Sequence, residues 1–459
     1  MGYSNKKSKF MGLGLSFVAV SVVSVFGFLY LSPEFEQNKP EIQIGDEVYW
    51  NLKSNLKVNL KDESGIKYYK ITYKDGKNDI VLDQKVFKTI EQSLTLDIKP
   101  PKLNLFSKID DAKLQIEVND NSKWDFFNGN NITKTVDIKI DTKAPVANVL
   151  GNSRYIQRGG SAVVVTQVED ENLVDKYIIF NDKKRFKLLP YKKENYFIAL
   201  IAWPIDIEKF HKVRLEAIDK AGNKTITKVP LYIQKKKIKN QKIPITKDFI
   251  KNVSEFVLER SGETVPNDLE ETFIYSNKDF REKNLKKIFE VSNKAMENEY
   301  VDNFDIKAFR RLRGSQTVAG YGERRKYYLD DRKINEAWHL GIDWASVKNA
   351  TVKVSNDGEV IFKDYLGLYG NTIIINHGMG LSSLYAHTSL QKVSVGDKVE
   401  SGQVIANTGA TGAVFGDHLH FGIVVQGVEV NPLEWMDKNW IKVRITNVLD
   451  KCNKIITGK

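Results

Sequence analysis

The sequence predicts a mainly β, multidomain protein: an N-terminal transmembrane helix, two β-sandwich modules, a helical connector and a C-terminal antiparallel β domain. Three observations predict this order. A long apolar run lies near the N-terminus, short strand-like runs fill residues 41–234, and strands return after a segment of helical periodicity. The 459 residues exceed what one core accommodates, and a hydrophobic content of 41% is sufficient for several packed domains.

The N-terminal segment predicts a membrane anchor. No charged residue occurs from Phe10 to Pro33, and the apolar stretch 11–31 has about the length that crosses a bilayer as a helix. Lysines within residues 1–10 precede it, and the positive-inside rule keeps this basic segment in the cytoplasm. The rest of the chain is therefore expected outside the cytoplasmic membrane. The alternative is a cleaved signal peptide, although no small-residue cleavage site follows the run.

The charge and the cysteine content exclude some functional classes. A formal net charge of +12 arises from lysines spread through the chain, which favours contact with an anionic surface, polymer or membrane. The sequence contains no recognisable basic helix or nucleic-acid module, so nucleic acid is not expected as a partner. The single cysteine, Cys452, excludes an intramolecular disulfide and a cysteine-based zinc site. Any metal must therefore be held by histidine and carboxylate side chains.

Residues 41–234 are predicted to form two β-rich modules, at 41–143 and 144–234. Runs of alternating or β-branched residues are separated by Asp-Gly, Asn-Gly and Gly-Asn turns. A weak internal repeat has a period of about 100 residues, which is the size of an Ig-like sandwich. Two pairs of segments carry it: 62–66 with 170–174, and 129–134 with 222–228. We expect the modules to act as spacers from the membrane or as docking modules.

Residues 235–312 are predicted to join these modules to the C-terminal domain. The lysine-rich run that ends near Pro244 is typical of a solvated linker. Apolar residues then recur at helical spacing from Phe249 to Val257, with Asp248 as the expected N-cap. We expect the helical segment 246–312 to pack as a collar around the C-terminal domain. A cover over the active site is the alternative.

The histidines indicate a metal site in the C-terminal domain. Five of the six lie between His339 and His420. A strand would place His339 and Asp343 on one face, with Gly341 leaving room for an ion, and His418 and His420 would likewise share a face. Three such ligands and a water form the open zinc site of a hydrolase, and further histidines remain to handle protons. Two histidines are interpreted as core or surface residues: His211 and His377.

Short motifs follow one another in the region from about Gly320 onward. They are Gly320–Arg325, His339–Asp343, Gly370–Gly378, Leu384–His387, Val395–Val399, Gly402–Ile405, Thr408–Gly412, Gly416–Gly422 and Val430–Pro432. In this order and spacing, residues 313–441 resemble the M23 (LytM-type, lysostaphin-like) metallopeptidases of bacterial cell walls. The ending Asn431–Trp435 is most similar to Gram-negative members, and residues 442–459 are expected to be a C-terminal tail.

The resemblance implies a division of roles among the candidate residues. It implies one zinc ion per domain, and two histidines that position or polarise the water and stabilise the tetrahedral intermediate. The implied zinc ligands are His339, Asp343 and His420, and the implied catalytic residues are His387 and His418. None of these five positions departs from the family motif.

Three further positions in this region carry expectations. Asn371 and Tyr385 match framework positions of the family motif, and we expect them to support the site without taking part in the chemistry. Trp344 follows the implied metal aspartate at a position where an aliphatic residue is more usual. This tryptophan is expected to reshape the wall of the groove.

The resemblance therefore implies a zinc-dependent peptidoglycan hydrolase that cleaves peptide cross-links of the bacterial cell wall, as a D,D-endopeptidase and also as a D,D-carboxypeptidase. It is expected in the inner membrane as a single-pass protein, with the C-terminal domains in the periplasm or cell-wall space. The expected partners are peptidoglycan, the cytoplasmic membrane, and a cell-wall, divisome or elongation protein bound by the Ig-like modules. The alternatives are a non-catalytic M23-like scaffold that activates a partner cell-wall amidase, and an adhesin. In related enzymes an upstream segment blocks the groove, and 246–312 is the candidate here.

Overall fold

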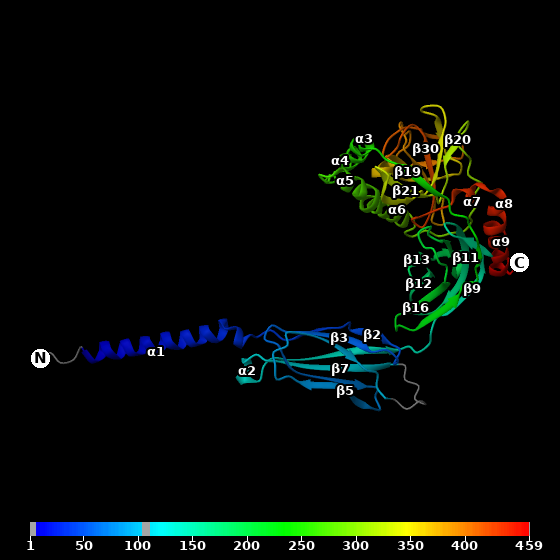
Figure 1. Cartoon of the computed structure of the whole chain (residues 1–459). Coiled ribbons are helices and arrows are strands. Elements are labelled where there is room, and N and C mark those ends of the chain that lie inside the picture. The colour runs from blue at the N-terminus through cyan, green and yellow to red at the C-terminus, as the bar shows by residue number, and fades with distance from the viewer. Residues whose placement is uncertain (1–5, 103–110, 459) are drawn as a thin grey trace. The chain divides into compact units, whose positions relative to one another are not determined.

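The computed structural model describes residues 6–102 and 111–458, which fold into two compact units (Figure 1). One unit contains the residues up to Ala144 together with the turn Asp219–Asn223. The other contains residues 145–218 and the chain from Lys224 onward. Strands predominate in both units outside the N-terminal helix, which confirms the predicted mainly β fold class.

The first unit begins with α1 (Lys6–Leu31), a helix of 26 residues. Its segment Gly14–Leu31 has a mean hydropathy of 2.1 and is, by length and composition, long and apolar enough to cross a membrane. Large apolar side chains along it, such as Phe17 and Val23, are exposed, whereas a core helix would bury them. A short 3-10 turn, η1 (Pro33–Phe35), follows the helix.

The first module contains two sheets that enclose a core of alternating apolar residues. One sheet has the order β1-β3-β6 and the other the order β2-β8-β7-β4-β5. In β7, every second side chain is buried, because successive residues of a strand point to opposite faces. The elements are β1 (Glu41–Gln43), β2 (Glu47–Trp50), β3 (Leu56–Lys61), β4 (Ile66–Lys74), β5 (Asp79–Val86), β6 (Ser93–Ile98), β7 (Asp111–Asp120), α2 (Trp124–Phe127) and β8 (Asn131–Ile140).

The second module is also built from paired sheets. Its two four-stranded sheets have the orders β14-β15-β11-β9 and β13-β12-β16-β17, and β10 pairs with β18. The strands are β9 (Val146–Asn152), β10 (Tyr155–Gln157), β11 (Ser161–Glu169), β12 (Leu173–Phe180), β13 (Lys184–Lys187), β14 (Leu189–Tyr191), β15 (Lys193–Ala202), β16 (Val213–Asp219), β17 (Lys224–Lys228) and β18 (Tyr232–Gln234). In both modules an early strand pairs in parallel with the last strand, β2 with β8 and β10 with β18.

The internal repeat has a structural counterpart at the Gly-Asn turns. Asp120 accepts hydrogen bonds from the backbone N–H and the side-chain amide of Asn130, both at 2.8 Å. Asp219 accepts the same two bonds from Asn223, again both at 2.8 Å. An aspartate that receives two donors from one asparagine fixes the turn that leads into the last strands. The repeat is therefore one of local geometry as well as of sequence, while the Ig-like assignment stays a prediction.

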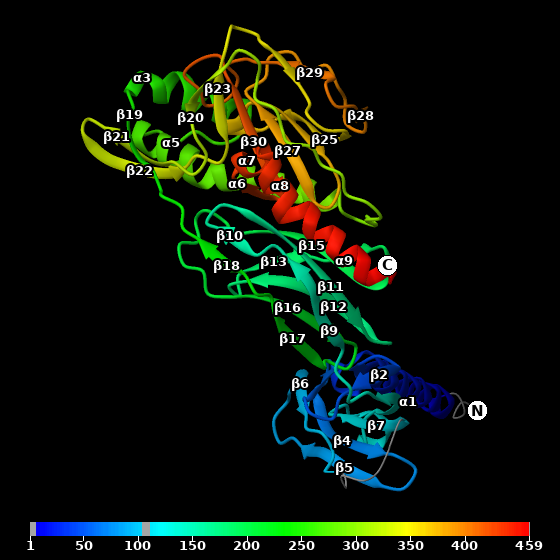
Figure 2. The ribbon, with the colours of Figure 1, turned by 90° about the vertical axis from the view of Figure 1, so that its right-hand side faces the viewer.

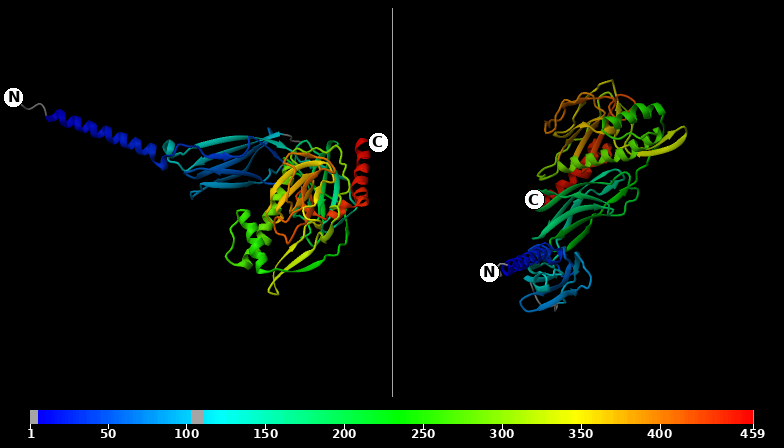
Figure 3. Two further views of the ribbon diagram at one scale, coloured as in Figure 1. Left: turned by 90° about the horizontal axis from the view of Figure 1, so that it is seen from above. Right: turned by 90° about the vertical axis from the view of Figure 1, so that its left-hand side faces the viewer.

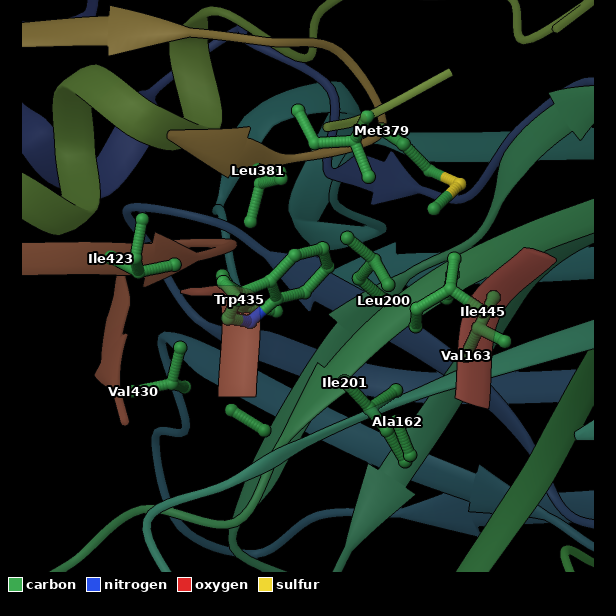
Figure 4. Packing of buried hydrophobic residues seen from close by; sticks show 14 of the residues in the cluster. Ala162, Val163, Leu200, Ile201, Met379, Leu381, Ile423, Val430, Trp435 and Ile445 are labelled. Carbon is green, nitrogen blue, oxygen red and sulfur yellow. The ribbon is translucent and has the colours of Figure 1, made fainter. Parts of the chain in front are cut away.

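The second module and the C-terminal domain share one hydrophobic core (Figure 4). Trp435 is fully buried in it, and its indole Nε1 donates a hydrogen bond to Ser161 Oγ at 3.1 Å. The side-chain amide of Gln426 donates to the carbonyl oxygens of Leu200 and Lys187, each at 3.0 Å. Separating the two would expose large apolar side chains to water. The two modules therefore differ in their surroundings, because the second module is part of the unit that carries the five clustered histidines.

The connector differs from its sequence-based prediction at its start. The expected linker contains β19 (Asn240–Pro244), which pairs in parallel with β21 (Arg324–Leu329). With β22 (Arg332–Trp338) these strands form the three-stranded sheet β19-β21-β22. The first helix is capped by Thr246, whose hydroxyl accepts the N–H of Phe249 at 3.1 Å, so the prediction of Asp248 as the N-cap is wrong by two positions. The helical elements are α3 (Lys247–Phe249), η2 (Ile250–Glu255), α4 (Phe256–Arg260), α5 (Leu269–Tyr275), η3 (Ser276–Phe280) and α6 (Arg281–Lys294). They lie beside the C-terminal domain in every view (Figure 1, Figure 2 and Figure 3).

The C-terminal domain is built on an antiparallel sheet with the strand order β20-β23-β30-β27-β26-β25-β28, and β31 pairs with β30. The elements up to the last strand are β20 (Gln316–Ala319), β21 (Arg324–Leu329), β22 (Arg332–Trp338), β23 (Ile342–Ala345), β24 (Thr351–Lys353), β25 (Gly358–Tyr365), η4 (Gly367–Tyr369), β26 (Asn371–Asn376), β27 (Leu381–Ala386), β28 (Lys398–Val399), β29 (Val404–Asn407), β30 (Leu419–Val425) and β31 (Val428–Val430). Four helical elements follow: α7 (Pro432–Met436), α8 (Lys438–Ile441), η5 (Lys442–Thr446) and α9 (Asn447–Thr457).

The expected C-terminal tail is a helix that packs on the second module (Figure 2). Cys452 of α9 is completely buried, and the phenol of Tyr191 donates a hydrogen bond to Asn453 Oδ1 at 2.5 Å. The side chain of Lys193 also reaches the carbonyl oxygen of Ile456 at 3.0 Å. The helix α9 therefore belongs to the shared core.

Candidate metal centre

Pairing of the central strands brings the candidate metal ligands together. Asp343 lies in β23 directly opposite His420 in β30, and Ala386 of β27 lies opposite His420 on its other side. His387 therefore follows β27 next to the same point of the sheet. His339 lies in the link between β22 and β23, because β23 begins only at Ile342. The expectation of one strand through His339 and Asp343 is thus wrong, although both side chains reach the same site.

The three candidate ligands converge through side-chain atoms that can bind a metal. Asp343 Oδ1 lies 2.8 Å from His420 Nδ1, and Asp343 Oδ2 lies 3.0 Å from His339 Nε2. The two histidine nitrogens are 3.2 Å apart. All three residues are buried, and their donor atoms lie within 4.8 Å of one another. Two imidazole nitrogens and one carboxylate form a donor set that Zn²⁺ prefers, with a fourth position left for water. The residues therefore fit zinc.

The protonation states also suit metal binding. Burial raises the pKa of Asp343, but the neighbouring His339 and His420 outweigh it and hold this pKa well below its usual range. Burial lowers the pKa of His420 to about 4, so its imidazole is neutral near neutral pH. An ionised carboxylate and a neutral imidazole are the forms that coordinate a cation.

Groups around the ligands orient them. His339 Nδ1 donates to the carbonyl oxygen of Gly320 at 2.8 Å, which leaves Nε2 free to face Asp343. An amino nitrogen of Arg325 donates to Asp343 Oδ2 at 3.3 Å. Gly341 leaves space for the ring of His420 rather than for an ion, because a Cβ there would lie 2.5 Å from His420 Nε2.

The other two candidate histidines lie beside the ligands. The rings of His387 and His418 are 4.9 Å apart, and the ring of His387 is 5.7 Å from that of His420. His387 Nδ1 donates to the carbonyl oxygen of Thr411, and His418 Nδ1 to that of Gly416, both at 2.8 Å. These bonds fix the tautomer in which each Nε2 can accept a proton. Burial, followed by the nearby His418 and His420, lowers the pKa of His387 well below its usual value.

A cavity of about 580 Å³ opens over these five residues. The connector forms one wall, with Phe273, Asn277 and Arg281, and the loop that precedes His418 forms the other. The rings of Phe249 and Phe415, which also line the cavity, stack at 4.5 Å. Among the described residues, the hydrogen bonds to the ligand side chains come from Gly320, Arg325 and the ligands themselves, and the connector contributes none of them.

The supporting positions are arranged in different ways. The side-chain amide of Asn371 donates to the carbonyl oxygen of Thr388 at 3.2 Å, and Tyr385 packs its ring on Phe421 at 5.5 Å. Trp344 is 2% exposed and stacks on Phe421 at 5.0 Å. It is thus a core residue that does not itself line the groove, and its effect on the shape of the groove wall stays a prediction. His377 bonds to the Asp357 carbonyl oxygen and to Ser383, as a structural histidine does.

Three residues near the site were given no role from the sequence: Arg325, Tyr327 and Glu429. Arg325 and Tyr327 both face the groove, and their spacing of two along β21 is the signal that could have found them. Glu429 is buried, and burial raises its pKa to about 8. Its carboxyl accepts the phenol of Tyr369 at 2.7 Å, and the ring of Tyr369 lies 5.6 Å from that of His420. The sequence did not predict this contact between Glu429 and Tyr369, because Glu429 lies in an ordinary alternating strand.

The region that carries these residues is similar to known proteins. Residues 337–432 match the sequence profile of Peptidase family M23. Over 95 residues, 21% of this chain and 22% of the relative, the chain is 41% identical to the DD-carboxypeptidase/endopeptidase Mpg of Neisseria meningitidis. Over 131 residues, 28% of this chain and 29% of the relative, it is 37% identical to the murein hydrolase activator EnvC of Escherichia coli. The matches thus span between a fifth and a third of these relatives' length.

Among solved structures, a zinc-containing peptidase from Vibrio cholerae is 14% identical, with 74% of this chain and 86% of that chain covered and a TM-score of 0.27. The profile match includes every histidine and aspartate of the site described above. The segment 337–432 of this chain is therefore a domain of peptidase family M23.

Proposed function

We propose that the chain is a zinc-dependent peptidoglycan hydrolase that cleaves peptide cross-links of the bacterial cell wall. One observation carries this proposal: His339, Asp343 and His420 converge beneath an open groove, and two more histidines with fixed tautomers stand beside them. A purely structural metal site would be closed, whereas a hydrolytic one keeps an open position. The name of the Neisseria relative supports D,D-endopeptidase and D,D-carboxypeptidase activity.

In this proposal His339 Nε2, His420 Nδ1 and an oxygen of Asp343 hold one zinc ion. When bound, zinc lowers the pKa of a water molecule and polarises a carbonyl group. His387 and His418 each present a ring nitrogen that accepts a proton from the nucleophile or donates one toward the developing oxyanion. The connector wall and the loop before His418 orient the peptide between them. Arg325 fixes the second oxygen of Asp343.

We further propose that α1 anchors the chain in the cytoplasmic membrane with its N-terminus inside. The modules and the M23 domain would then lie in the periplasm or cell-wall space, where peptidoglycan is present. The apolar composition of Gly14–Leu31 and the lysines that precede it support this orientation. We also propose that the two modules bind a cell-wall, divisome or elongation protein.

A second candidate is a scaffold that activates a partner amidase. The similarity to the E. coli activator favours it. The presence of three residues that fit zinc and of two further histidines favours catalysis instead, since a pure activator has no need of them. The two functions differ in what the zinc-loaded chain does alone.

The test is mass spectrometry of the muropeptides released from purified sacculi by the full chain, purified in detergent and loaded with zinc. We expect cross-linked dimers to disappear with the wild type and to persist with His420→Ala. The identity of the new termini then names the bond. If zinc-loaded wild type leaves every dimer intact but accelerates a wall amidase, the chain is a scaffold and the enzymatic proposal is wrong.

A further inference from the structure

Large aromatic side chains gather on one loop of the first module. The aromatic loop, Lys123–Asn128, contains α2 (Trp124–Phe127), and there Phe126 is 93% exposed and Phe127 67% exposed. The indole of Trp124 is also exposed, at 38%. Adjacent phenylalanines are usually buried in a water-soluble module, and a cluster left outside marks a contact surface.

The backbone of the aromatic loop is held in an unfavourable conformation. Asp125, Phe126 and Phe127 have φ angles of 49°, 54° and 70°, which is the left-handed region for three successive residues other than glycine. Such a conformation persists only where surrounding contacts enforce it, and it is found preferentially at functional sites. Here the backbone N–H groups of Asn128 and Gly129 close the turn on Asp125 and Trp124, at 3.1 Å each. The turn directs two phenylalanines away from the core of the module.

Hydrogen bonds fix the aromatic loop to the segment that leaves α1. The backbone N–H of Lys123 donates to the carbonyl oxygen of Glu34 at 2.7 Å, and the ammonium of Lys123 pairs with the carboxylate of Glu34 at 2.5 Å. Ser122 Oγ donates to the carbonyl oxygen of Glu36 at 2.6 Å. The amide of Asn130 reaches the same oxygen at 3.0 Å. Four contacts thus tie the base of the loop to residues 34–36.

Aromatic rings continue this connection into the helix. The ring of Phe35 lies 6.3 Å from that of Phe127 and 6.4 Å from that of Phe28, which belongs to the last turns of α1. The apolar span of α1 ends at Leu31. If α1 crosses a bilayer, residues 32–36 leave it at the level of the headgroups, and the loop is held at that depth. Phenylalanine and tryptophan side chains favour this interfacial zone.

We propose that the aromatic loop inserts Phe126 and Phe127 into the outer headgroup region of the bilayer that α1 crosses. The loop is then a second membrane contact, which holds the first module against the membrane surface. The inference rests on the proposed membrane anchoring by α1 and is independent of any catalytic activity. The occupant is the lipid bilayer, and a protein partner is the outcome that the test has to separate from it.

The test uses the full chain, reconstituted into phosphatidylcholine vesicles, with an NBD fluorophore attached to a cysteine at Asn128→Cys. That site is exposed and leaves all three aromatic residues intact, while the native Cys452 is buried and does not label in the folded chain. Two control sites carry the same probe, Gly27→Cys within α1 and Lys77→Cys in the β4–β5 turn. Because β4 pairs with β7 from Ile66 to Lys74, that turn lies at the opposite end of the module from the loop.

We expect brominated lipids to quench the probe at position 128 roughly twofold or more, as for a group close below the phosphates, and to leave the probe at 77 unquenched. Adding Phe126→Ser and Phe127→Ser should abolish quenching at 128 and keep it at 27. Quenching at 27 without quenching at 128 would leave the anchor standing and overturn the loop contact. A blue-shifted but unquenched probe at 128 would mean a protein contact and overturn it too. No quenching at 27 would refute the anchor and the loop together.

Discussion

Asp343 and His420 face each other across the β23–β30 ladder, with Oδ1 and Nδ1 2.8 Å apart. Residues directly opposite in an antiparallel pair keep their side chains on the same face at close distance. The relative position of these two candidate ligands is therefore fixed by the sheet itself, whereas the third candidate, His339, lies in a link between strands.

Substitution of a predicted zinc ligand and substitution of a predicted catalytic histidine are expected to have different effects on zinc content. His420→Ala should lose stoichiometric zinc and all cleavage of sacculi, because it removes one of three donor atoms. His387→Ala should keep its zinc and still lose about 10²- to 10⁴-fold in turnover, as for loss of a proton-transfer group. Metal analysis by mass spectrometry beside muropeptide release checks both. Zinc loss in the His387 variant would contradict the assignment of roles.

Arg325 is expected to strengthen zinc binding through Asp343. Arg325→Ala should lower the zinc affinity about 10- to 100-fold, because the guanidinium orients a carboxylate that holds the metal. Lys326→Ala is the matched control, since the next residue of β21 points to the other face of the strand. Competition with a chromophoric chelator measures both affinities. Equal affinities for the two variants would show that the Arg325 contact is dispensable.

Gly341 is expected to be irreplaceable. In Gly341→Ala the new methyl group would lie 2.5 Å from His420 Nε2 and 2.6 Å from the carbonyl oxygen of Phe421, and the backbone partner cannot yield. We expect a loss of about 1–3 kcal/mol in the free energy of unfolding, together with weaker zinc binding. Gly416→Ala is the control, because a Cβ there meets no atom within 4 Å. Urea unfolding measures the free energy of unfolding of both variants, and chelator competition measures their zinc affinity. Equal values for the two variants would contradict the prediction.

The unfolding free energy is expected to fall as the pH rises. Burial raises the pKa of Glu434 from 4.5 to about 7, so the folded chain binds this proton more tightly than the unfolded chain. The resulting stabilisation is complete below about pH 4.5 and is lost as the pH rises through about 7, with a magnitude of about 3 kcal/mol. The protonated carboxyl of Glu429 also stabilises the folded chain, and this contribution is lost as the pH rises through about 8. Burial lowers the pKa of Lys236 to about 8, so the unfavourable contribution of this buried group to the free energy of unfolding is relieved only above that pH.

Glu434→Gln isolates this contribution, since the amide keeps the shape and cannot ionise. Urea unfolding at about pH 5 and about pH 7.5 should show a smaller difference for the variant than for the wild type. Equal differences would mean that Glu434 ionises in the folded state without cost.

The hypothesis that the connector restrains catalysis makes one sharp prediction. Phe249→Ala removes the ring that stacks on Phe415 in the lining of the groove and should raise the rate of cleavage of intact sacculi. Phe256→Ala is the control, because that ring is 51% exposed and does not line the groove. An unchanged or lower rate for Phe249→Ala would show that the connector wall serves substrate binding.

The sequence was sufficient for what is local or carried by a motif. The spacing of His339, Asp343, His418 and His420 indicated the site because each lies in a short, recognisable stretch. The apolar helix and the strand-rich modules followed from composition and alternation. The roles assigned to the five site residues and the division into domains remain predictions, since geometry alone does not test them.

What the sequence could not predict depends on contacts between distant residues. The hydrogen bond from Trp435 to Ser161 joins positions 274 residues apart, and no periodicity records it. The strand β19 was predicted as part of a linker because the lysine-rich run 235–239 lies directly before it, yet its pairing with β21 stabilises it. Gly341 was predicted to leave space for an ion. Its neighbour is the ring of His420, which lies on another strand and far from it in the sequence.

The shared core of the second module and the M23 domain limits where this chain can be divided to make chimaeras. Because Trp435, Gln426 and the helix α9 complete the second module, that module is not an independent cassette. A chimaera that grafts residues 313–441 onto a foreign stalk would leave two apolar faces without their complements. A gene fusion that respects this fold has to carry the segment from Pro145 onward as a single heritable piece.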